Sequence, residues 1–229
     1  MTMLICLSAA NCKSQLIHYT PNDSGNGHWY EAVRVPESIT WTAANDAAQA
    51  RGGYLATVTT STENQWVFDN LAGDPTRWIV DSFGFHAGPY IDGYQDSSSP
   101  TFSEPAGGWT WVTGETWGYT SWAPGQPNDV GEQDFLHYWT GNASIPQSTL
   151  QDIGDDASDN RPISFIIEYD TNPTCTADTN SDGLVDAADF TYWLFSYNSR
   201  APQCDQNSDG TCTPADFSAW IANFNAGCN

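Results

Sequence analysis

Residues 108–134 read GWTWVTGETWGYTSWAPGQPNDVGEQD, the stretch from which the fold of the larger part of the chain can be inferred. Short runs rich in tryptophan and threonine alternate with glycine, proline, asparagine and aspartate, and apolar residues do not recur at helical spacing. This pattern predicts short strands joined by turns and long loops. Runs of tryptophan in a folded domain are usually structural, so we expect Trp109, Trp111 and Trp122 in its core.

Helical signals precede this stretch. Thr40 is a good N-cap for a helix over residues 41–50, which ends at a Gly-Gly pair. Residues 54–58 then read as a strand, and Ser61 caps a second predicted helix. Two helices followed by short β runs predict an α+β domain with much irregular structure.

The order of these pieces resembles a C-type lectin-like domain across residues 28–170. The matching motifs are Gly52–Val58, Glu63-Asn64, Tyr90–Asp96, Gly108–Glu115, Tyr119–Asn128, Gly131–Asp134, Leu150–Asp152 and Phe165–Tyr169. The resemblance implies an α+β fold with two helices, short antiparallel strands and long loops. The family usually carries two disulfides, whereas this chain has no cysteine between Cys12 and Cys175. We therefore expect an aromatic core to stabilise the domain.

In carbohydrate-binding members of that family, a calcium ion lies at a Glu-Pro-Asn or Gln-Pro-Asp loop, and adjacent sugar hydroxyls coordinate it. The resemblance implies a cis proline in this loop and places the site at Gln126, Asn128, Glu132, Asp134, Gln151 and Asp152. The triplet Gln126-Pro127-Asn128 mixes the two family patterns, and its neutral amides should weaken calcium binding relative to a carboxylate. Gln151 also replaces the asparagine of the family's Trp-Asn-Asp motif. The alternative is a structural loop that keeps the proline turn without binding sugar.

Two loops near the C-terminus start at residues 178 and 205 and repeat each other at a spacing of 27 residues. A calcium loop presents oxygen ligands at positions 1, 3, 5, 7, 9 and 12 and has glycine at position 6. Both copies have that glycine, and position 7 would bind through its backbone carbonyl. The predicted ligands are Asp178, Asn180, Asp182, Leu184, Asp186 and Asp189, and then Asp205, Asn207, Asp209, Thr211, Thr213 and Asp216. Two copies in register favour calcium binding over solvated acidic loops.

Each loop is followed by apolar residues at helical spacing, but Pro173 and Pro202 argue against a helix entering either loop. This duplicated loop–helix unit, over residues 171–229, resembles a dockerin of the cysteine-containing planctomycete type, a calcium-folded domain that joins extracellular bacterial proteins to a cohesin. The resemblance implies a small all-α module with calcium as cofactor and a cohesin-like or other surface protein as partner. It departs from cellulosomal dockerins at loop positions 10 and 11, occupied here by Ala187-Ala188 and Pro214-Ala215.

Four cysteines lie in this module, Cys175, Cys204, Cys212 and Cys228. A segment this small needs a metal or cross-links for stability. Four cysteines allow three connectivities, of which we favour Cys175–Cys228, joining the ends, and Cys204–Cys212, bracketing the second loop. Zinc is the competing explanation, but the module contains no Cys-x-x-Cys pair.

The composition argues against several partners. The chain has 28 acidic and 6 basic residues and a formal net charge of −22, so nucleic acids and anionic membranes are poor partners. No apolar run is long enough to span a bilayer. We expect residues 1–27 to be the remnant of an export signal or an extension, and the cysteine-rich tail favours an extracellular or cell-surface location.

These features lead to one main functional hypothesis and one alternative. The main hypothesis is an exported, calcium-dependent carbohydrate-binding protein, attached through its C-terminal module to a bacterial surface. The alternative is a C-type lectin-like domain that binds protein or is structural. An enzyme is not expected, because the four histidines are scattered and no pair of carboxylates is marked as acid and base.

Overall fold

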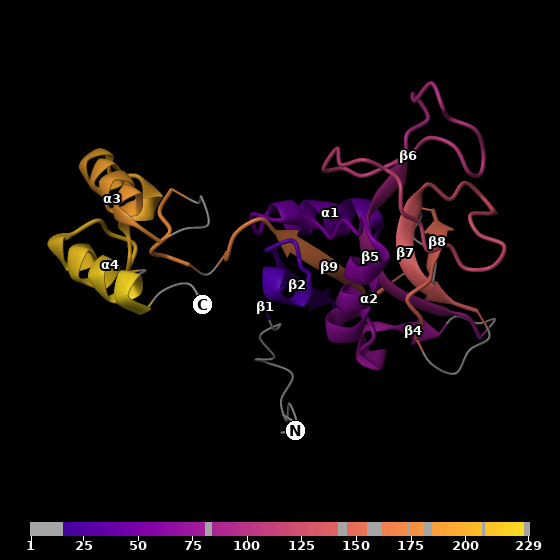
Figure 1. The fold of residues 1–229 in the computed structure, drawn as a ribbon, viewed down its shortest axis with the longest axis horizontal. Helices are drawn as coiled ribbons and strands as arrows, with labels where there is room; N and C mark the ends of the chain where they lie inside the picture. Colours follow the sequence, from indigo (N-terminus) through magenta and orange to yellow (C-terminus); the bar gives the residue numbers. More distant parts are fainter. Residues whose placement is uncertain are drawn as a thin grey trace.

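The computed structural model describes residues 16–80, 84–141, 146–154, 162–173, 175–180, 185–207 and 209–226. They form a larger unit of strands and helices and a smaller unit of two helices (Figure 1). The chain passes from one unit to the other once, after the last strand of the larger unit. Among the described helices, none combines the length and the apolar character needed to cross a membrane.

The larger unit is built on one nine-stranded sheet. Its main path runs in the order β1 (Leu16–His18), β2 (Trp29–Arg34), β9 (Ser164–Tyr169), β5 (His86–Gln95), β7 (Phe135–Thr140) and β8 (Leu150–Ile153). Short strands pair beside this path, β3 (Tyr54–Leu55) with β9, and β4 (Ile79–Val80) and β6 (Trp109–Thr110) with β5. These strands pair in antiparallel fashion, except that β5 and β9 are parallel. Strand β1 lies before the predicted domain start at residue 28, so the sheet includes residues assigned above to an N-terminal extension.

Pairing of β2 with β9 brings the beginning and the end of the larger unit together. Trp29 lies opposite Tyr169, and Arg34 opposite Ser164. All six side chains of β9 are buried, so neither face of this strand is open to water. Ile166 packs in one apolar cluster, whereas Phe165 and Ile167 pack in another, as the alternation of side chains along a strand requires.

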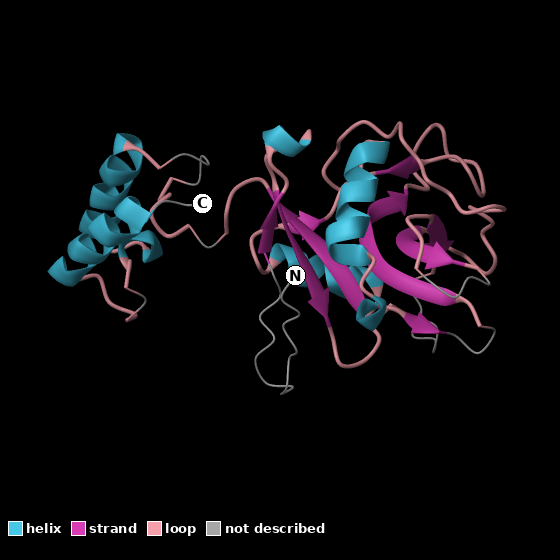
Figure 2. Ribbon diagram, turned by 60° about the horizontal axis from the view of Figure 1, so that its bottom comes forward, coloured by secondary structure: helices cyan, strands magenta, loops and turns pink. Residues whose placement is uncertain are grey.

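Two helices cover these clusters. Helix α1 (Trp41–Gln49) packs on the Phe165 side, and helix α2 (Ser61–Val67) packs on the Ile166 side and continues through a π-helical turn over Phe68–Ala72. Figure 2 shows these helices against the strands of the larger unit. The predicted α+β fold with two helices, short antiparallel strands and long loops is therefore confirmed. Trp109 and Trp111 are buried, as predicted, and Trp122 packs partly buried against the same cluster.

Two local predictions differ from the structure. Thr60, not Ser61, caps the second helix, because Thr60 has extended backbone and its side chain accepts a hydrogen bond from the Glu63 N–H. The strand predicted over residues 54–58 is paired with β9 at Tyr54 and Leu55, and the Ala56 N–H still donates to the Ile166 carbonyl of β9 (2.9 Å). It ends early because the Thr57 N–H donates to the Glu168 carboxylate rather than to a neighbouring strand.

The smaller unit contains the two predicted helices, α3 (Ala187–Ser199) and α4 (Pro214–Ala226). Its interior is aromatic: the rings of Phe190 and Trp220 lie 5.1 Å apart and those of Trp193 and Phe217 lie 5.6 Å apart. A single 3-10 turn, Pro202–Cys204, leads into the second loop. Among the described residues, no α-helix enters either loop, in agreement with the prediction from the prolines.

Candidate carbohydrate site and calcium loops

The predicted carbohydrate loop is fixed to the sheet on both sides. Before the loop, the Ala123 N–H donates to the Leu150 carbonyl (2.9 Å), and the Leu150 N–H donates to the Ser121 carbonyl (2.8 Å). After the loop, the Asp134 carbonyl accepts from the Gln95 N–H at the end of β5 (2.8 Å). Because β7 and β8 then pair, the segments that contain Gln126, Asp134 and Gln151 all belong to one end of the sheet.

The loop itself has a defined backbone. The Gln126–Pro127 bond is cis, as the resemblance implied. The Val130 N–H donates to the side-chain oxygens of Asn128 and Gln133, both at 3.1 Å. The Gln133 N–H in turn donates to the Asp129 carboxylate at 2.9 Å. These bonds give the loop its shape from its own polar side chains.

Two predicted ligands carry buried oxygens without hydrogen-bond partners. They are the amide oxygens of Gln126 and Gln151. A buried acceptor left unsatisfied costs about 1–3 kcal/mol, so a group that satisfies it is favoured. A hard cation is such a group, since calcium takes side-chain amide oxygens as ligands. These two oxygens are the feature of the structure that fits the predicted calcium ion.

The acidic side chains around the loop repel one another. Burial raises the pKa of Asp134, and the charges of Asp129 and Glu132 raise it further. Burial also raises the pKa of Glu104, with contributions from Asp129, Asp134 and Glu132. A bound cation would relieve this repulsion.

Glu104 and Asp129 were missed by the sequence analysis. Asp129 directly follows the Gln126-Pro127-Asn128 triplet, and Glu104 precedes a proline, as Gln126 does, so both positions carried a local signal. The Asp152 side chain lies outside the described residues, while Asn128 and Glu132 are exposed. Among the described residues, no three carboxylate, histidine or cysteine side chains are grouped as a metal site. A calcium site here would therefore depend on amide oxygens.

The described residues of the second C-terminal loop have a defined backbone. Gly210, at position 6, has a φ of +83°, the left-handed backbone that favours glycine. Asp205, at position 1, accepts from the Asp209 N–H (3.0 Å) and the Gly210 N–H (2.8 Å). Asp209 accepts from the Thr211 N–H (2.9 Å), and its pKa is lowered by the hydroxyl and N–H of Thr211. The carboxylates thus organise the loop backbone, and their hard oxygens suit calcium.

Position 12 closes each loop in the same way. Asp216 is buried and accepts from the Gln206 N–H (3.0 Å) and the Thr213 N–H (2.7 Å). Asp189 is also buried and accepts from the Asn180 N–H (3.2 Å) and the Asp186 N–H (2.9 Å). The two copies therefore share three-dimensional contacts as well as sequence. Asp182 and Leu184 of the first loop lie outside the described residues.

One of the two predicted disulfides is described. Cys204 and Cys212 are bonded, with their Cα atoms 5.6 Å apart. Cys175 is also in a disulfide, but its predicted partner Cys228 lies outside the described residues.

A second polar cluster, which the sequence analysis missed, lies beneath α2. The buried carboxylates of Glu63 and Glu168 share the Tyr30 hydroxyl as a hydrogen-bond donor, at 3.0 and 2.7 Å. His28 Nδ1 lies 2.6 Å from Glu168, and this hydrogen bond raises the pKa of His28 although burial opposes it. The pKa of Glu168 is itself raised by burial. Residues from three separate segments meet here, so no local pattern could have predicted the cluster.

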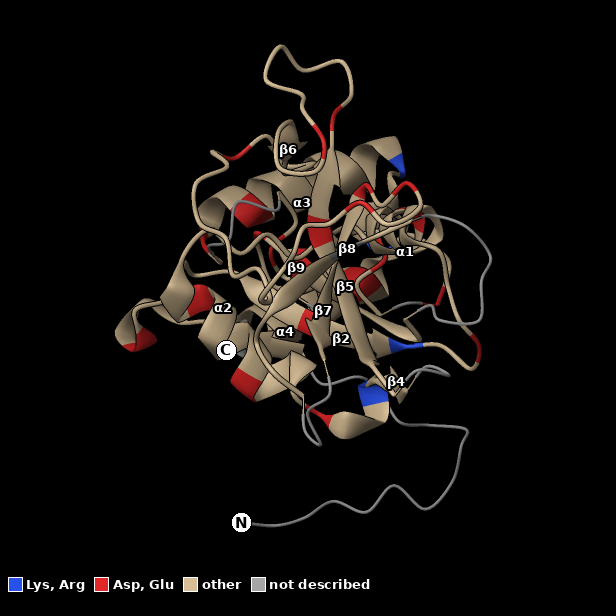
Figure 3. Ribbon diagram, turned by 90° about the vertical axis from the view of Figure 1, so that its right-hand side faces the viewer, with Lys and Arg blue, Asp and Glu red and all other residues tan. Residues whose placement is uncertain are grey.

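Acidic residues are found on both units, as Figure 3 shows in red, whereas arginines are few. In the part of the chain described, two arginines form ion pairs with acidic side chains: Arg51 with Glu31 (3.0 Å) and Arg77 with Asp74 (3.5 Å). The structure thus offers no basic surface for phosphate groups among its described residues.

Comparisons with known proteins support the larger unit's resemblance. No protein-family model matches the chain. A perlucin-like protein of Mytilus galloprovincialis is 31% identical over 106 residues, which is 46% of this chain. The chain spans 58% of the length of that relative.

Solved structures are also similar to part of this chain. The cow CD23 C-type carbohydrate-recognition domain, crystallised in the presence of a GlcNAc2Man3 oligosaccharide, is 14% identical with a TM-score of 0.47, covering 69% of this chain and 95% of its own. Human lithostathine is 18% identical with a TM-score of 0.46, and the match covers 74% of this chain and 97% of lithostathine. A calcium-independent type II antifreeze protein is 18% identical with a TM-score of 0.45, covering 71% and 96%.

Proposed function

We propose that this chain is an exported, calcium-dependent carbohydrate-binding protein without catalytic activity, attached through its C-terminal module to a cohesin-like or other surface protein. The observation that carries the carbohydrate part is the pair of buried, unpartnered amide oxygens of Gln126 and Gln151. They belong to two segments that hydrogen bonds join at one end of the sheet.

Each predicted residue has a role in this proposal. Gln126 and Gln151 supply neutral oxygens to calcium, and Asp134 supplies charge. Asn128 and Glu132 are exposed, so they are accessible to sugar hydroxyls. Asp129 stabilises the loop through the Gln133 N–H. A ligand set with few charges implies weak calcium binding, which suits an extracellular medium where calcium is abundant.

The test is a glycan array probed with the full chain in calcium and again in excess chelator. We expect binding to at least one glycan class in calcium only. Gln126→Ala should abolish that binding, whereas Gln147→Ala, at an exposed glutamine outside the loop, should leave it intact. Glycan binding that persists in chelator, or none in either condition, would contradict the proposal.

A second candidate function is protein binding by the same loops without calcium. One observation in its favour is Val130, whose side chain is 72% exposed in the middle of the loop. Another is that, among the described residues, no three histidine, cysteine, aspartate or glutamate side chains are grouped so that they could hold a metal ion. Calorimetric titration of calcium into the chain and into the Gln126→Ala variant separates the two functions. A calcium-binding event lost in the variant supports the carbohydrate function, and identical titrations support the protein-binding function.

The docking role is supported by exposed aromatic side chains on the first repeat. Tyr192 and Phe195 are 41% and 66% exposed on α3 and lie in ring contact at 6.3 Å. The second repeat has Ala219 and Ala222 at the equivalent positions. We therefore propose that the partner, a surface protein with an apolar patch, contacts the first repeat.

A further inference from the structure

The two C-terminal loops differ in how their shape is maintained. The second loop carries the Cys204–Cys212 disulfide, whose Cα atoms are 5.6 Å apart. The first loop has Ala177 and Val185 at the equivalent positions and therefore lacks such a cross-link. The two repeats thus differ at the two positions that the disulfide joins in the second loop.

The loops also differ in their predicted ligands. The first loop offers carboxylates at positions 1, 5, 9 and 12. The second has Thr213 at position 9 in place of the first loop's Asp186, so it has one carboxylate fewer. Fewer carboxylates lower the affinity of a calcium loop when rigidity is equal. The loop with the weaker ligand set is the one with the disulfide.

We propose that the Cys204–Cys212 disulfide positions the second loop for calcium and compensates for its missing carboxylate. Calcium binding by the second loop then depends on this disulfide, whereas binding by the first loop does not. This inference rests on the proposed calcium-binding function of the two loops. It assigns Cys204 and Cys212 a role as positioning residues rather than only as a link that stabilises the module.

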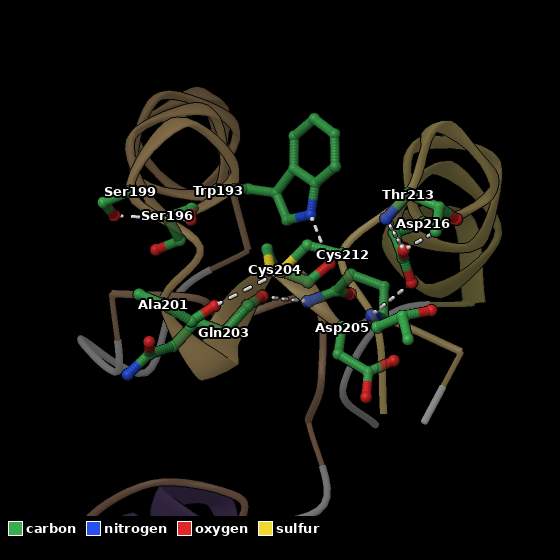
Figure 4. Close-up of a disulfide and its surroundings, with 12 residues drawn as sticks. Trp193, Ser196, Ser199, Ala201, Gln203, Cys204, Asp205, Cys212, Thr213 and Asp216 are labelled. Atoms are coloured by element: carbon green, nitrogen blue, oxygen red, sulfur yellow. Dashed lines mark hydrogen bonds between the residues drawn. A yellow bond between two sulfur atoms is a disulfide. The ribbon is translucent and has the colours of Figure 1, made fainter. Parts of the chain in front are cut away.

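The position of the disulfide supports this role. Cys204 directly precedes Asp205 at position 1, and Cys212 is position 8, between Thr211 and Thr213. The bond therefore fixes the first ligand relative to the two ligands at positions 7 and 9. Figure 4 shows the disulfide between the two helices, next to Asp205 and Asp216.

The disulfide is itself anchored to the rest of the module. Cys204 is fully buried, and its carbonyl accepts a hydrogen bond from the indole N–H of Trp193 on α3 (3.2 Å). The Cys212 sulfur lies 3.7 Å from the carbonyl of Ala201. One end of the cross-link thus contacts the middle of α3 and the other contacts the chain just after α3, so the start of the loop is fixed in space before any ion binds.

The oxygens that would bind calcium are already ordered in this arrangement. Both carboxylate oxygens of Asp205 accept loop N–H groups, and so do both of Asp216. A loop fixed in its binding shape loses less conformational entropy when it binds. From the loop-closure entropy of a short cross-link, we expect a gain in affinity of about tenfold to a hundredfold.

Breaking the bond is a balanced thiol–disulfide exchange. A dithiol reductant gives two electrons to the Cys204–Cys212 bond, the two cysteine sulfurs end as thiols, and the reductant becomes a disulfide. No other bond of the loop changes, so the calcium response of the loop reports the effect of the cross-link.

The test follows each loop separately in the full chain. Gly183 and Gly210 occupy position 6 of the two loops, and the Gly210 N–H donates to the Asp205 carboxylate. In 15N-glycine-labelled protein, their amide resonances report calcium binding loop by loop. In the Cys204→Ser/Cys212→Ser variant, we expect Gly210 to titrate at about tenfold to a hundredfold higher calcium, with Gly183 unchanged.

Three controls keep the test decisive. Cys175→Ser removes the disulfide that Cys175 forms, which is separate from Cys204–Cys212, and it should leave the Gly210 titration unchanged. Wild-type protein treated with a dithiol gives a second measurement if the double variant folds poorly. If Gly210 titrates at the same calcium concentration without the disulfide, or if Gly183 weakens equally, the inference is overturned. If neither glycine responds in the oxidised wild type, the proposed calcium function itself fails.

Discussion

At the scale of single residues, the proposed calcium affinity of the candidate carbohydrate site depends on the chemistry of Gln126. Its amide oxygen is buried and without a hydrogen-bond partner, whereas a carboxylate at the same place would add a charge to the ligand set. Charge count is a main determinant of calcium affinity. In the proposed site, this residue would therefore set the calcium concentration that binding requires.

We expect Gln126→Glu to tighten calcium binding by about tenfold, because it adds one carboxylate to the ligands. Isothermal titration calorimetry of the full chain measures the change. Gln147→Glu is the matched control, since it adds the same charge at an exposed glutamine away from the loop. Equal effects of the two variants would show that overall charge, not ligation, is responsible.

The buried pair Glu63 and Glu168 makes stability depend on the proton of His28. The Glu168 hydrogen bond raises the pKa of His28 above its ordinary value of 6.5. Charged His28 therefore stabilises the fold fully below that ordinary value, and the stabilisation disappears as pH rises through the raised pKa. The neighbouring charges are Glu168 and Asp170 on its own side of the sheet and Glu115 from a loop.

We expect His28→Gln to lower the melting temperature at pH 6 and to have a smaller effect at pH 9. Thermal unfolding followed by circular dichroism across that range checks this. His86→Gln is the control, because His86 lies on β5 outside the cluster. A deficit that is constant with pH would mean that His28 acts through packing alone.

The residue-level site could be predicted only where its members are close in sequence. Gln126-Pro127-Asn128 and the repeated loops are local patterns, and the structure describes the turn at Gln126–Pro127 and the turn at Gly210 of the second loop. His28, Glu63 and Glu168 are far apart in the chain and meet only because β2 pairs with β9 over α2. Physical proximity of this kind has no local signature.

At the scale of elements, the helices were the most predictable part of the fold. Helix α1 begins where Thr40 suggested, and the Thr40 hydroxyl accepts from the Ala43 N–H (3.1 Å). The cap of helix α2 is Thr60, one residue before the predicted cap Ser61. Thr60 and Ser61 are both good caps, and only the backbone conformation distinguishes them. Short strands were less predictable, since pairing partners and not propensity set their length.

The two neighbouring hydroxyls allow a direct test of the helix start. Thr60→Ala should destabilise the larger unit by about 1 kcal/mol, because it removes the hydrogen bond to the Glu63 N–H. Its melting temperature should fall by roughly 2–4 °C. Ser61→Ala, inside the first turn, should have little effect, and the reverse result would restore Ser61 as the cap.

At the scale of the whole molecule, the two units differ in what stabilises them. The larger unit has two apolar clusters on the two faces of β9. The smaller unit has a thin aromatic interior, in which Phe217 and Phe224 remain 41% and 37% exposed. A core of this size is marginal, so the cross-links and the calcium loops should supply the remaining stability. The division into two units was predictable because the repeat marks the second one, but the pairing of distant strands that closes the first one was not.

This difference predicts two separate responses to calcium removal. In excess chelator, the like charges of the aspartate loops are no longer neutralised, and we expect α3 and α4 to unfold or to melt at a much lower temperature. The larger unit should keep a cooperative transition, shifted at most by the binding energy of its own weaker site. Differential scanning calorimetry of the full chain, with calcium, with chelator and after calcium is restored, would resolve the two transitions.

Asp205→Ala with calcium present should reproduce part of the chelator effect, because it removes one loop's first ligand while the other loop stays intact. Melting of the smaller unit that is unchanged by chelator would mean that its aromatic interior and disulfides suffice, and that the repeated loops are structural turns.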